Sequence, residues 1–528
     1  MDNRGELASD GAKTAYNRLT NDRAPYVTRG ENNAALTIPS LFPKDSDDGS
    51  TDFTQPWQSV GARGVNNMAN RMMMTSFPLE PWFKLNVNSF AMKDLIEDPE
   101  TYEEVEKVLG QIETTMMEHM DSNGYRPVFY EAECLLLITG NCLLHIPELT
   151  DDPEARSTPK CYNLHSYVIQ RDAYDNLLQI ITLDKVAYGA LPEDVRKGIA
   201  ETGDMKPDTE VEVYTHIYLS DEGDVYYTYQ EVEGEIVKGT EGEYPIGGLP
   251  WIPIRLKKIS GEHYGRSYVD DWYADLNALD QLTEDFLKFT RISSKVVGLV
   301  NPAGITRPKR ITDAQTGDFV AGRKADIEFL QLDKMNDYQV VRGTMEMLEG
   351  RLSYGFLLNS AVQRDAERVT AEEVRYVARE LEATTGGLYA VQSQEFQLPL
   401  IKVLLNQLQS AQVIPELPDG AIEPKVSTGL EAIGRGQDLQ RLIEFIEVAT
   451  SIAQLEDDRD INVRTLKMRA ANALGIDSDG LLLSREELME LQAQEAMGEG
   501  MINAGGAMGQ AMGQDPEQAA AMAAEMGM

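Results

Sequence analysis

The chain has 528 residues, more than one ordinary core can hold, which predicts roughly three or four compact units. Its 42% apolar and 26% charged residues are typical of a globular protein and exclude a small disulfide-stapled scaffold. The 48 Lys and Arg against 87 Asp and Glu leave a net charge of −39, so the surface as a whole repels polyanions and argues against a broad basic DNA-binding face.

Helices and loops alternate in the first part of the chain. Residues 3–19 are predicted to be helical, and the prolines from Pro25 to Pro56 predict a loop-rich stretch after them. A second helix is predicted over 57–74, where apolar residues recur at helical spacing, and a third over 99–120. Residues 128–149 predict a helix plus a buried strand whose boundary the pattern does not fix.

Residues 162–254 change to a period of two, which predicts an antiparallel sheet. The runs 209–219 and 224–237 alternate acidic or polar residues with Val, Tyr and Ile. Gly223 lies in the turn between them, so we expect a hairpin. Because the acids alternate along strands, we expect them on a solvated face rather than in a catalytic carboxylate pair.

Two amphipathic helices then flank an insert at Val296–Leu332. The first is predicted over 272–289 and the second over 338–352, and each has a single apolar stripe that steps by three and four residues. The stripes consist of Trp272, Leu276, Leu279, Leu282, Phe286 and Phe289, and of Tyr338, Val341, Met345, Leu348 and Leu352.

The segment from Lys288 to Lys324 reverses the charge of the chain. It has eight basic residues and two acids, Asp313 and Asp318, and is therefore a +6 island. Two interpretations remain open: a solvated loop beyond a helix end, or a contact with a polyanion or an acidic protein. The basic residues are Lys288, Arg291, Lys295, Arg307, Lys309, Arg310, Arg323 and Lys324.

Beyond Leu358 the chain is polar and aperiodic until a capping box at Thr370–Glu373, which predicts a loop followed by a long helix. Such a loop is either a functional site or a connector. Gly386, Gly387 and Pro399 can bend or interrupt the helix. Helices are expected again from Gly436, and residues 497–528 form a Met-, Gly- and Ala-rich tail.

Signatures of catalysis are scarce. Cys134, Cys142 and Cys161 contain no C-x-x-C pair, which argues against a disulfide framework or a cysteine zinc site and indicates a reducing environment. The five histidines lack metal-ligand spacing, and no P-loop motif occurs, so we expect no metal, no cofactor and no ATPase activity. We also expect no membrane span and no secretory signal. The alternative is a soluble acidic hydrolase that uses a carboxylate pair such as Glu372 and Glu373.

Six long, collinear segments resemble the portal, or head-to-tail connector, proteins of short-tailed autographivirus-type podophages. The likeness runs from about Gly11 to Glu495. The segments are NDRAPYVTRGENNAALTIPSLFP (21–43), QPWQSVGARGVNNMANRMM (55–73), YGRSYVDDW (264–272), SSKVVGLVNPAGITRPKRITDAQTGDFVAGR (293–323), LNSAVQRDAERVTAEEVRYVARELE (358–382) and STGLEAIGRGQDLQRL (427–442).

The resemblance implies an α+β, mainly helical portal fold that assembles as a ring. Its parts would be a wing of helices and antiparallel sheet (1–262), a first stem helix (263–295), a clip (296–332), a second stem helix (333–357), a tunnel loop (358–369), a long helix returning to the wing (370–428), a helical crown (429–496) and a flexible tail (497–528).

The resemblance also implies a non-enzymatic function. About twelve copies would form a channel at one capsid vertex of the virion, assembled in the host cytoplasm, for DNA packaging, retention and ejection. The implied partners are double-stranded DNA, the major capsid and scaffolding proteins, the terminase ATPase, the tail adaptor and internal core proteins at the crown. No membrane partner is implied.

Candidate site residues follow from these assignments. Gln363, Arg364 and Arg368 would contact DNA in the tunnel loop, although either arginine could instead pair with Asp365, Glu367 or a neighbouring subunit. The clip would present Arg307, Lys309, Arg310, Arg323 and Lys324 to the motor or tail adaptor, or line the exit. Lys288, Arg291 and Lys295 would close the first stem helix, where cations complement the helix dipole.

Overall fold

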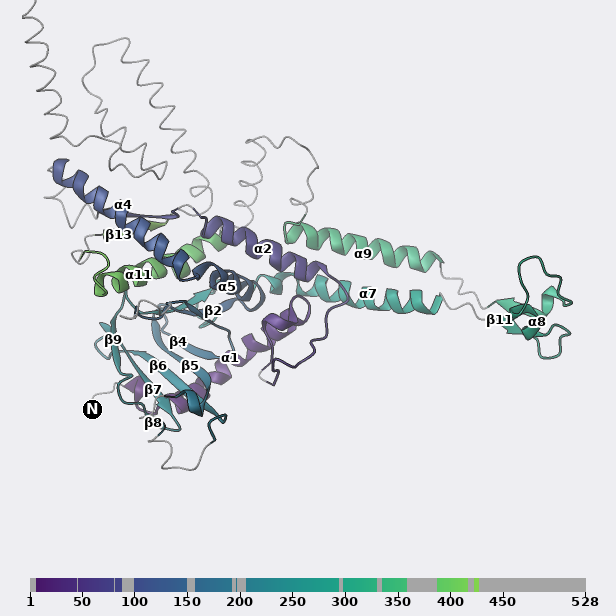
Figure 1. Ribbon diagram of the computed structural model, residues 1–528, viewed down its shortest axis with the longest axis horizontal. Coiled ribbons are helices and arrows are strands. Elements are labelled where there is room, and N and C mark those ends of the chain that lie inside the picture. Colours follow the sequence, from purple (N-terminus) through teal and green to yellow (C-terminus); the bar gives the residue numbers. More distant parts are fainter. Residues whose placement is uncertain are drawn as a thin grey trace, which may run out of the picture. The chain divides into compact units, whose positions relative to one another are not determined.

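The computed structural model describes residues 6–44, 46–79, 81–87, 99–149, 157–191, 196, 206–293, 298–329, 335–358, 387–415 and 422–426 (Figure 1). They belong to the first of two units, Met1–Ile433, and the second, Gly434–Met528, lies outside the described residues. The predicted loop after Leu358, the capped helix at Thr370, the helices from Gly436 and the tail also lie outside them. No helix in these ranges is long and apolar enough to cross a bilayer.

The first helix differs from its prediction. After a short 3₁₀ turn, η1 (Glu6–Ala8), helix α1 spans Ala12–Ala35 and therefore continues through Pro25. Tertiary contacts on both sides hold the helix despite the backbone hydrogen bond that a proline cannot make. Arg23 is buried and donates to the carbonyl oxygens of His165 and Tyr167, at 2.7 and 2.9 Å. The prediction of a loop was wrong up to Ala35, because sequence periodicity carries no information on such distant partners. The described residues of 36–59 are loop apart from the 3₁₀ turn η2 (Pro39–Leu41), as predicted.

Three further helices build the main core. They are α2 (Val60–Ser76), α4 (Pro99–Ser122) and α5 (Tyr125–Thr139), and each confirms its prediction to within a few residues. The segment 128–149 resolves into α5 and a buried strand, β2 (Asn141–His145). Gly140 separates the two elements, since its φ of 79° is in the left-handed region and a Cβ there would lie 2.3 Å from the carbonyl carbon of Arg266.

An antiparallel sheet divides two apolar clusters. Its order is β4 (Tyr167–Arg171), β5 (Leu177–Ala187), β6 (Glu210–Leu219), β7 (Val225–Val232) and β8 (Glu235–Ile236), and β9 (Gly242–Pro245) also pairs with β7. The 3₁₀ turn η3 (Tyr188–Ala190) follows β5. The predicted hairpin is β6–β7, with Leu219 paired to Tyr226.

Most acidic residues of the two runs are exposed, as expected, although Glu231 of β7 is buried. Glu210 is exposed, but Val213–Tyr218 are buried on both faces. Tyr214 and Tyr218 pack with Tyr16 of α1, while Ile217 faces the main core. The sheet is therefore covered on both sides, an arrangement that the acid-to-apolar alternation did not predict.

A second, three-stranded sheet has the order β10 (Trp251–Arg255), β2 and β3 (Lys160–Tyr162). Next to it lie a π-helical turn, η6 (Ser393–Gln397), and α11 (Leu398–Ser410), so the backbone stays helical from 387 and Pro399 occupies the first turn of α11. Strand β1 (Phe83–Val87) pairs with β13 (Ile422–Val426). We call the elements up to β10, together with 387–426, the body.

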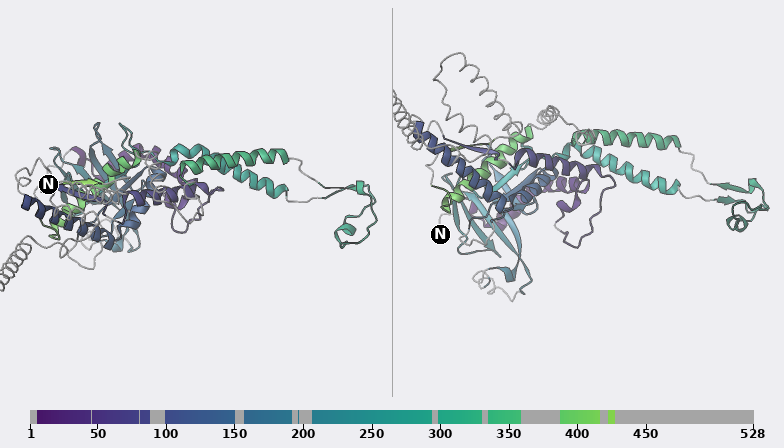
Figure 2. Two further views of the ribbon diagram at one scale, coloured as in Figure 1. Left: turned by 90° about the horizontal axis from the view of Figure 1, so that it is seen from above. Right: turned by 45° about the horizontal axis from the view of Figure 1, so that its top comes forward.

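The two predicted amphipathic helices are present and antiparallel. They are α7 (Tyr273–Ser293), which follows the 3₁₀ turn η4 (Val269–Trp272), and α9 (Met335–Gly355). Figures 1 and 2 show them side by side. The ring centroids of Phe286 and Tyr338 are 4.5 Å apart near one end, and Arg351 forms a 2.9 Å ion pair with Asp275 near the other. We call α7 and α9 the helix pair.

Candidate interaction site on the insert

The residues between the helix pair form a small folded element, described over 298–329, that we call the insert. Strand β11 (Gly298–Val300) pairs with β12 (Ile327–Phe329), and between them lie α8 (Pro308–Thr312) and the 3₁₀ turn η5 (Lys324–Asp326). Thirty-odd residues cannot enclose a sizeable apolar core. Polar contacts therefore have to hold the loops in place.

Asp326 is the centre of those polar contacts. Its carboxylate accepts hydrogen bonds from the backbone N–H of Ile305 and Thr306, both at 3.1 Å, and from the Thr306 hydroxyl at 2.8 Å. These bonds, with that of Thr306 first, lower the pKa of Asp326. The Thr306 hydroxyl also accepts from the backbone N–H of Arg323 at 2.8 Å. One carboxylate thus fixes the loop that precedes α8 to the turn that precedes β12.

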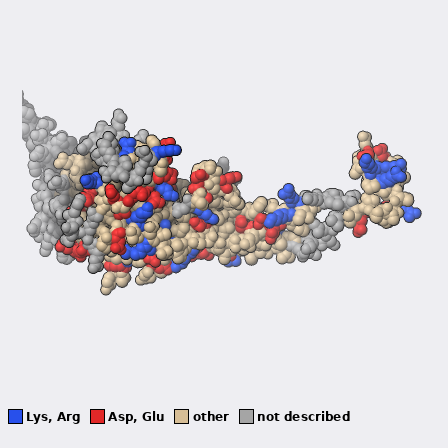
Figure 3. Space-filling view, turned by 90° about the horizontal axis from the view of Figure 1, so that it is seen from below, with Lys and Arg blue, Asp and Glu red and all other residues tan. Residues whose placement is uncertain are grey.

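All five basic residues that the sequence predicted for this site are on its surface. Arg307, Lys309, Arg310, Arg323 and Lys324 are exposed, and within the described residues none forms an ion pair. Figure 3 shows Lys and Arg side chains gathered on the insert, whereas acidic and basic side chains alternate over the body. The structure brings the five cations together on one small element, which makes the insert a positive surface on an acidic protein.

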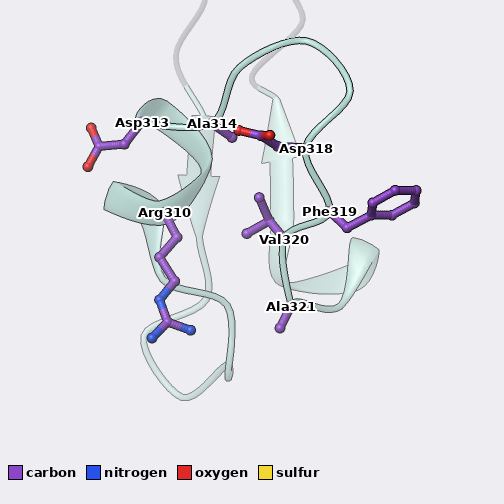
Figure 4. A pocket seen from close by; sticks show the side chains of 7 residues that line it. All are labelled: Arg310, Asp313, Ala314, Asp318, Phe319, Val320 and Ala321. Carbon is purple, nitrogen blue, oxygen red and sulfur yellow. The ribbon is translucent and has the colours of Figure 1, made fainter.

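The insert also exposes large apolar side chains, which the sequence analysis missed. Phe319 is fully exposed, at 104%, and Ile305 is 69% exposed. Leu299, Ile311 and Val320 are exposed too. In Figure 4 the Phe319 ring points away from α8, beside an open pocket of about 500 Å³ that Arg310, Asp313 and Val320 help to line. The available signal was the contrast between apolar residues and an element too short to bury them.

The basic residues at the end of α7 have different surroundings. Lys288 forms a 2.8 Å ion pair with Glu284 one turn earlier, and this hydrogen bond raises the pKa of Lys288. Arg291 is exposed in the last turn, as the helix dipole favours, and Lys295 lies outside the described residues. These cations are therefore separate from those of the insert.

A second exposed apolar surface, also missed, runs along α9. Val340, Met347 and Tyr354 are 69%, 55% and 65% exposed and recur every seven residues, with Gly343 and Gly350 between them. A Cβ at either glycine would meet nothing within 4 Å. At about 100° per residue this stripe lies opposite the face that packs on α7. Its alternating steps of three and four are those of a helix-packing seam, and we call it the α9 seam.

The predicted DNA contacts Gln363, Arg364 and Arg368 lie outside the described residues, as do Glu372 and Glu373 of the alternative carboxylate pair. Among the residues that the structure describes, no group of three or more His, Cys, Asp or Glu side chains is arranged to hold a metal ion. The described residues expose charged and apolar side chains, and these suit contacts with other macromolecules.

Comparison with known proteins gives consistent matches over nearly the whole chain. The family model described as "Bacteriophage head to tail connecting protein" matches residues 9–482. The chain is 51% identical to the portal protein of Escherichia phage T7 over 529 residues, which cover 99% of this chain and 98% of that protein. It is also 51% identical to the portal protein of Enterobacteria phage T3, with the same coverage, and 29% identical to that of Pseudomonas phage phiKMV, over 88% and 91% of the two chains.

Among solved structures, a chain from the virion of a native gene transfer agent particle is similar at 13% identity. Its TM-score is 0.35, and the match covers 74% of this chain and 86% of that chain.

Proposed function

The chain belongs to the bacteriophage head-to-tail connecting proteins, the portal proteins, and from this membership we propose that about twelve copies close into a ring around a channel for double-stranded DNA. The observation that carries this proposal is the 51% identity to a portal protein over 99% of the chain. The ring would occupy one capsid vertex, where the major capsid and scaffolding proteins would bind it and internal core proteins would bind its crown. Mass measurement of the native particle tests it: a stable monomer contradicts the ring.

The α9 seam is the surface that we assign to ring closure. Apolar ridges at Val340, Met347 and Tyr354 with glycine gaps between them fit a helix of the next subunit, because small residues allow close approach. In a heterologous contact, two different surfaces of neighbouring subunits meet. Such a contact generates a closed ring when the rotation from each subunit to the next brings the last subunit back to the first. Each buried seam side chain then contributes about 1–3 kcal/mol at every interface.

Two matched substitutions on α9 test the seam. Met347→Gln places an amide in the seam, whereas Glu349→Gln places the same amide at an exposed position outside it. We expect native mass measurement to show fewer closed rings for Met347→Gln and an unchanged distribution for Glu349→Gln. Equal ring populations for the two variants would contradict the assignment.

We infer that the insert is the clip, the surface that first binds the packaging motor and then the tail adaptor. Its exposed cations suit an acidic partner surface, and its exposed aromatic and aliphatic side chains suit burial in an interface. Because this chain lacks a P-loop, the energy of translocation would come from the terminase ATPase.

Charge reversal tests the clip. We expect Arg307→Glu, Lys309→Glu and Arg310→Glu together to weaken attachment of the motor or tail, and the difference from the parent protein to shrink as salt rises. The matched control reverses three exposed lysines of the body, Lys84, Lys402 and Lys425, which changes the net charge equally. Full tail assembly on the clip variant, or the same loss with the control, would contradict the role.

Passage of DNA depends on how phosphate meets the channel wall. A chain with a net charge of −39 supplies repulsion, so DNA can move without the strong binding that a basic lining would give. We propose that Arg364 and Arg368, with Gln363 beside them, contact phosphate transiently at the tunnel loop. Arg364→Ala with Arg368→Ala should then leave rings intact but reduce genome filling of particles. Normal filling would refute this.

A further inference from the structure

Two of the three cysteines lie together in the body, although they are far from adjacent in sequence. Cys142 of β2 and Cys161 of β3 are 19 residues apart, and their Sγ atoms are 3.0 Å apart, a hydrogen-bonded contact. Strand register explains the contact: Leu144 pairs with Cys161, so Cys142 lies on the same face of the sheet, diagonally across from it. The third cysteine, Cys134, is buried in α5 and is a free thiol as well.

The two thiols of the pair differ in accessibility. Cys142 is fully buried in the main core, whereas Cys161 is only partly buried on a strand of three residues at the edge of its sheet. The hydrogen bond with Cys161, followed by burial, raises the pKa of Cys142 above its ordinary value. A soluble reagent can therefore reach Cys161 first, and the Cys142 thiol lies in contact with Cys161 on the buried side.

We propose that Cys142 and Cys161 are a reversible redox pair, in which a disulfide oxidant such as glutathione disulfide converts the two thiols into a bond between β2 and β3. In the first step the Cys161 thiolate attacks one sulfur of glutathione disulfide, forms a mixed disulfide and releases one glutathione thiolate. In the second step Cys142, after losing its proton to solvent, attacks Sγ of Cys161 and releases the other glutathione thiolate. The protein loses two protons and two electrons, and the oxidant becomes two glutathione molecules.

The consequence is a covalent restraint on an edge strand. Strand β3 pairs with β2 through three residues, and the chain between the strands includes residues 150–156, which lie outside the described ranges. A bond that closes this loop restricts the unfolded chain and keeps β3 in register. The pair would be a dithiol in a reducing cell interior and a disulfide in oxidising surroundings, which is compatible with a sequence that lacks a disulfide framework.

Peptide mapping of the assembled, full-length protein tests the proposal. The protein is incubated with glutathione disulfide and then unfolded in denaturant with N-ethylmaleimide, so that the buried thiols that remain are blocked too. It is digested without a reductant. We expect one linked peptide pair that contains Cys142 and Cys161, with Cys134 carrying maleimide. Stable glutathione on Cys161 beside a maleimide-blocked Cys142, a bond to Cys134, or bonds formed only between isotopically labelled and unlabelled chains would each overturn it.

Single substitutions assign the order of attack. Cys142→Ser removes the second thiol, so the mixed disulfide should persist on Cys161, whereas Cys161→Ser should leave Cys142 unmodified. Cys134→Ser is the matched control and should leave the yield of the linked pair unchanged. Oxidation should also raise the thermal midpoint of the parent, by about 2–4 °C, and not that of Cys161→Ser. An unchanged midpoint in a fully linked protein would contradict the restraint on β3.

Discussion

Phe396 in the body and Phe319 in the insert are the same residue type in opposite environments. Phe396 is fully buried, with its ring centroid 4.8 Å from that of Phe77 and 5.2 Å from that of Phe129, whereas Phe319 is 104% exposed. Charged residues differ in the same way. Arg255 of the body is buried between Asp175 and Glu395, while Arg307 of the insert is exposed and has no ion-pair partner in the described part of the chain.

The comparison separates side chains that find their contacts within one subunit from side chains that stay exposed and are available to other copies or partners. In the body, the apolar side chains of the core meet one another and the buried Arg255 has two counter-charges, so these contacts are satisfied within the subunit. The helix pair buries residues mainly where it meets the main core, at Leu276, Leu279, Leu348 and Leu352. The rest of the pair and the insert expose surface that other copies or partners would bury.

The largest expected effect concerns Arg255. Its guanidinium donates to Asp175 at 2.7 and 2.8 Å and to Glu395, and these bonds raise the pKa of Arg255 although burial opposes the rise. Arg255→Ala leaves Glu395 without its ion-pair partner among the described residues and Asp175 with Lys258 alone, so we expect the free energy of unfolding to fall by about 3–5 kcal/mol in denaturant titrations.

Arg342 in the helix pair is the matched control. It forms a 2.9 Å ion pair with Glu346 one turn away, but both side chains are more than 60% exposed. Arg342→Ala should cost less than about 0.5 kcal/mol, because water screens such a pair. Similar losses for the two arginines would remove the contrast between the regions.

The next effect is a pH dependence of the body. Glu133 of α5 is fully buried, and burial raises its pKa to about 8 against an ordinary value near 4.5, although Gln392 donates to it at 2.6 Å and opposes the rise. The folded state thus holds a proton that the unfolded state releases. Stability from this group is complete below pH 4.5 and should fall as pH rises toward 8, by at most about 1.4 kcal/mol per pH unit.

Denaturant titrations from pH 5 to 8 measure this slope. Glu133→Gln keeps the shape of the side chain without its titration, so its slope should be flatter than that of the parent protein. Glu118→Gln, at an exposed position of α4, is the control and should keep the parental slope. Identical slopes for all three proteins would show that Glu133 is not a buried proton-binding group.

The sequence predicted most of the regular elements because their signals are local. The stripes of α7 and α9 are complete within each helix, and the β6–β7 hairpin follows from alternation around Gly223. Helix α1 was misjudged because the contacts that hold it across Pro25 come from residues more than a hundred positions away. The contact of Cys142 with Cys161 depends on strand register, which periodicity alone does not fix.

The candidate site was predicted in the same partial way. The cations of the insert were visible as a reversal of charge along the chain, and in the structure they are exposed. Phe319 was missed because it lies in a loop of an element too short to bury it, and the α9 seam because a search for the buried face of a helix disregards apolar residues on the opposite face. The available signal was two pairs of residues that each repeat after seven positions, Gly343 with Gly350 and Val340 with Met347.

A smaller effect is expected at Gly355, where α9 ends against the body. A Cβ there would lie 2.4 Å from the Trp272 ring, so Gly355→Ala forces the ring or the helix to move. We expect a loss of about 1–3 kcal/mol in the free energy of unfolding. Gly350→Ala on the open side of the same helix should be neutral or stabilising in the unassembled subunit, by up to about 1 kcal/mol. Equal destabilisation by both changes would place α9 differently against Trp272.

The smallest effect on folding is expected at Phe319, and it separates the two regions most directly. Phe319→Ala removes a ring that is fully exposed among the described residues, so the free energy of unfolding should change by less than about 0.5 kcal/mol, whereas Phe396→Ala should cost about 3–5 kcal/mol. The same Phe319 variant should nevertheless bind the motor or the tail more weakly, since an aromatic ring at the centre of an interface is a frequent source of affinity. If its attachment is unaffected as well, the exposed ring has no partner and the clip assignment has to rest on the cations alone.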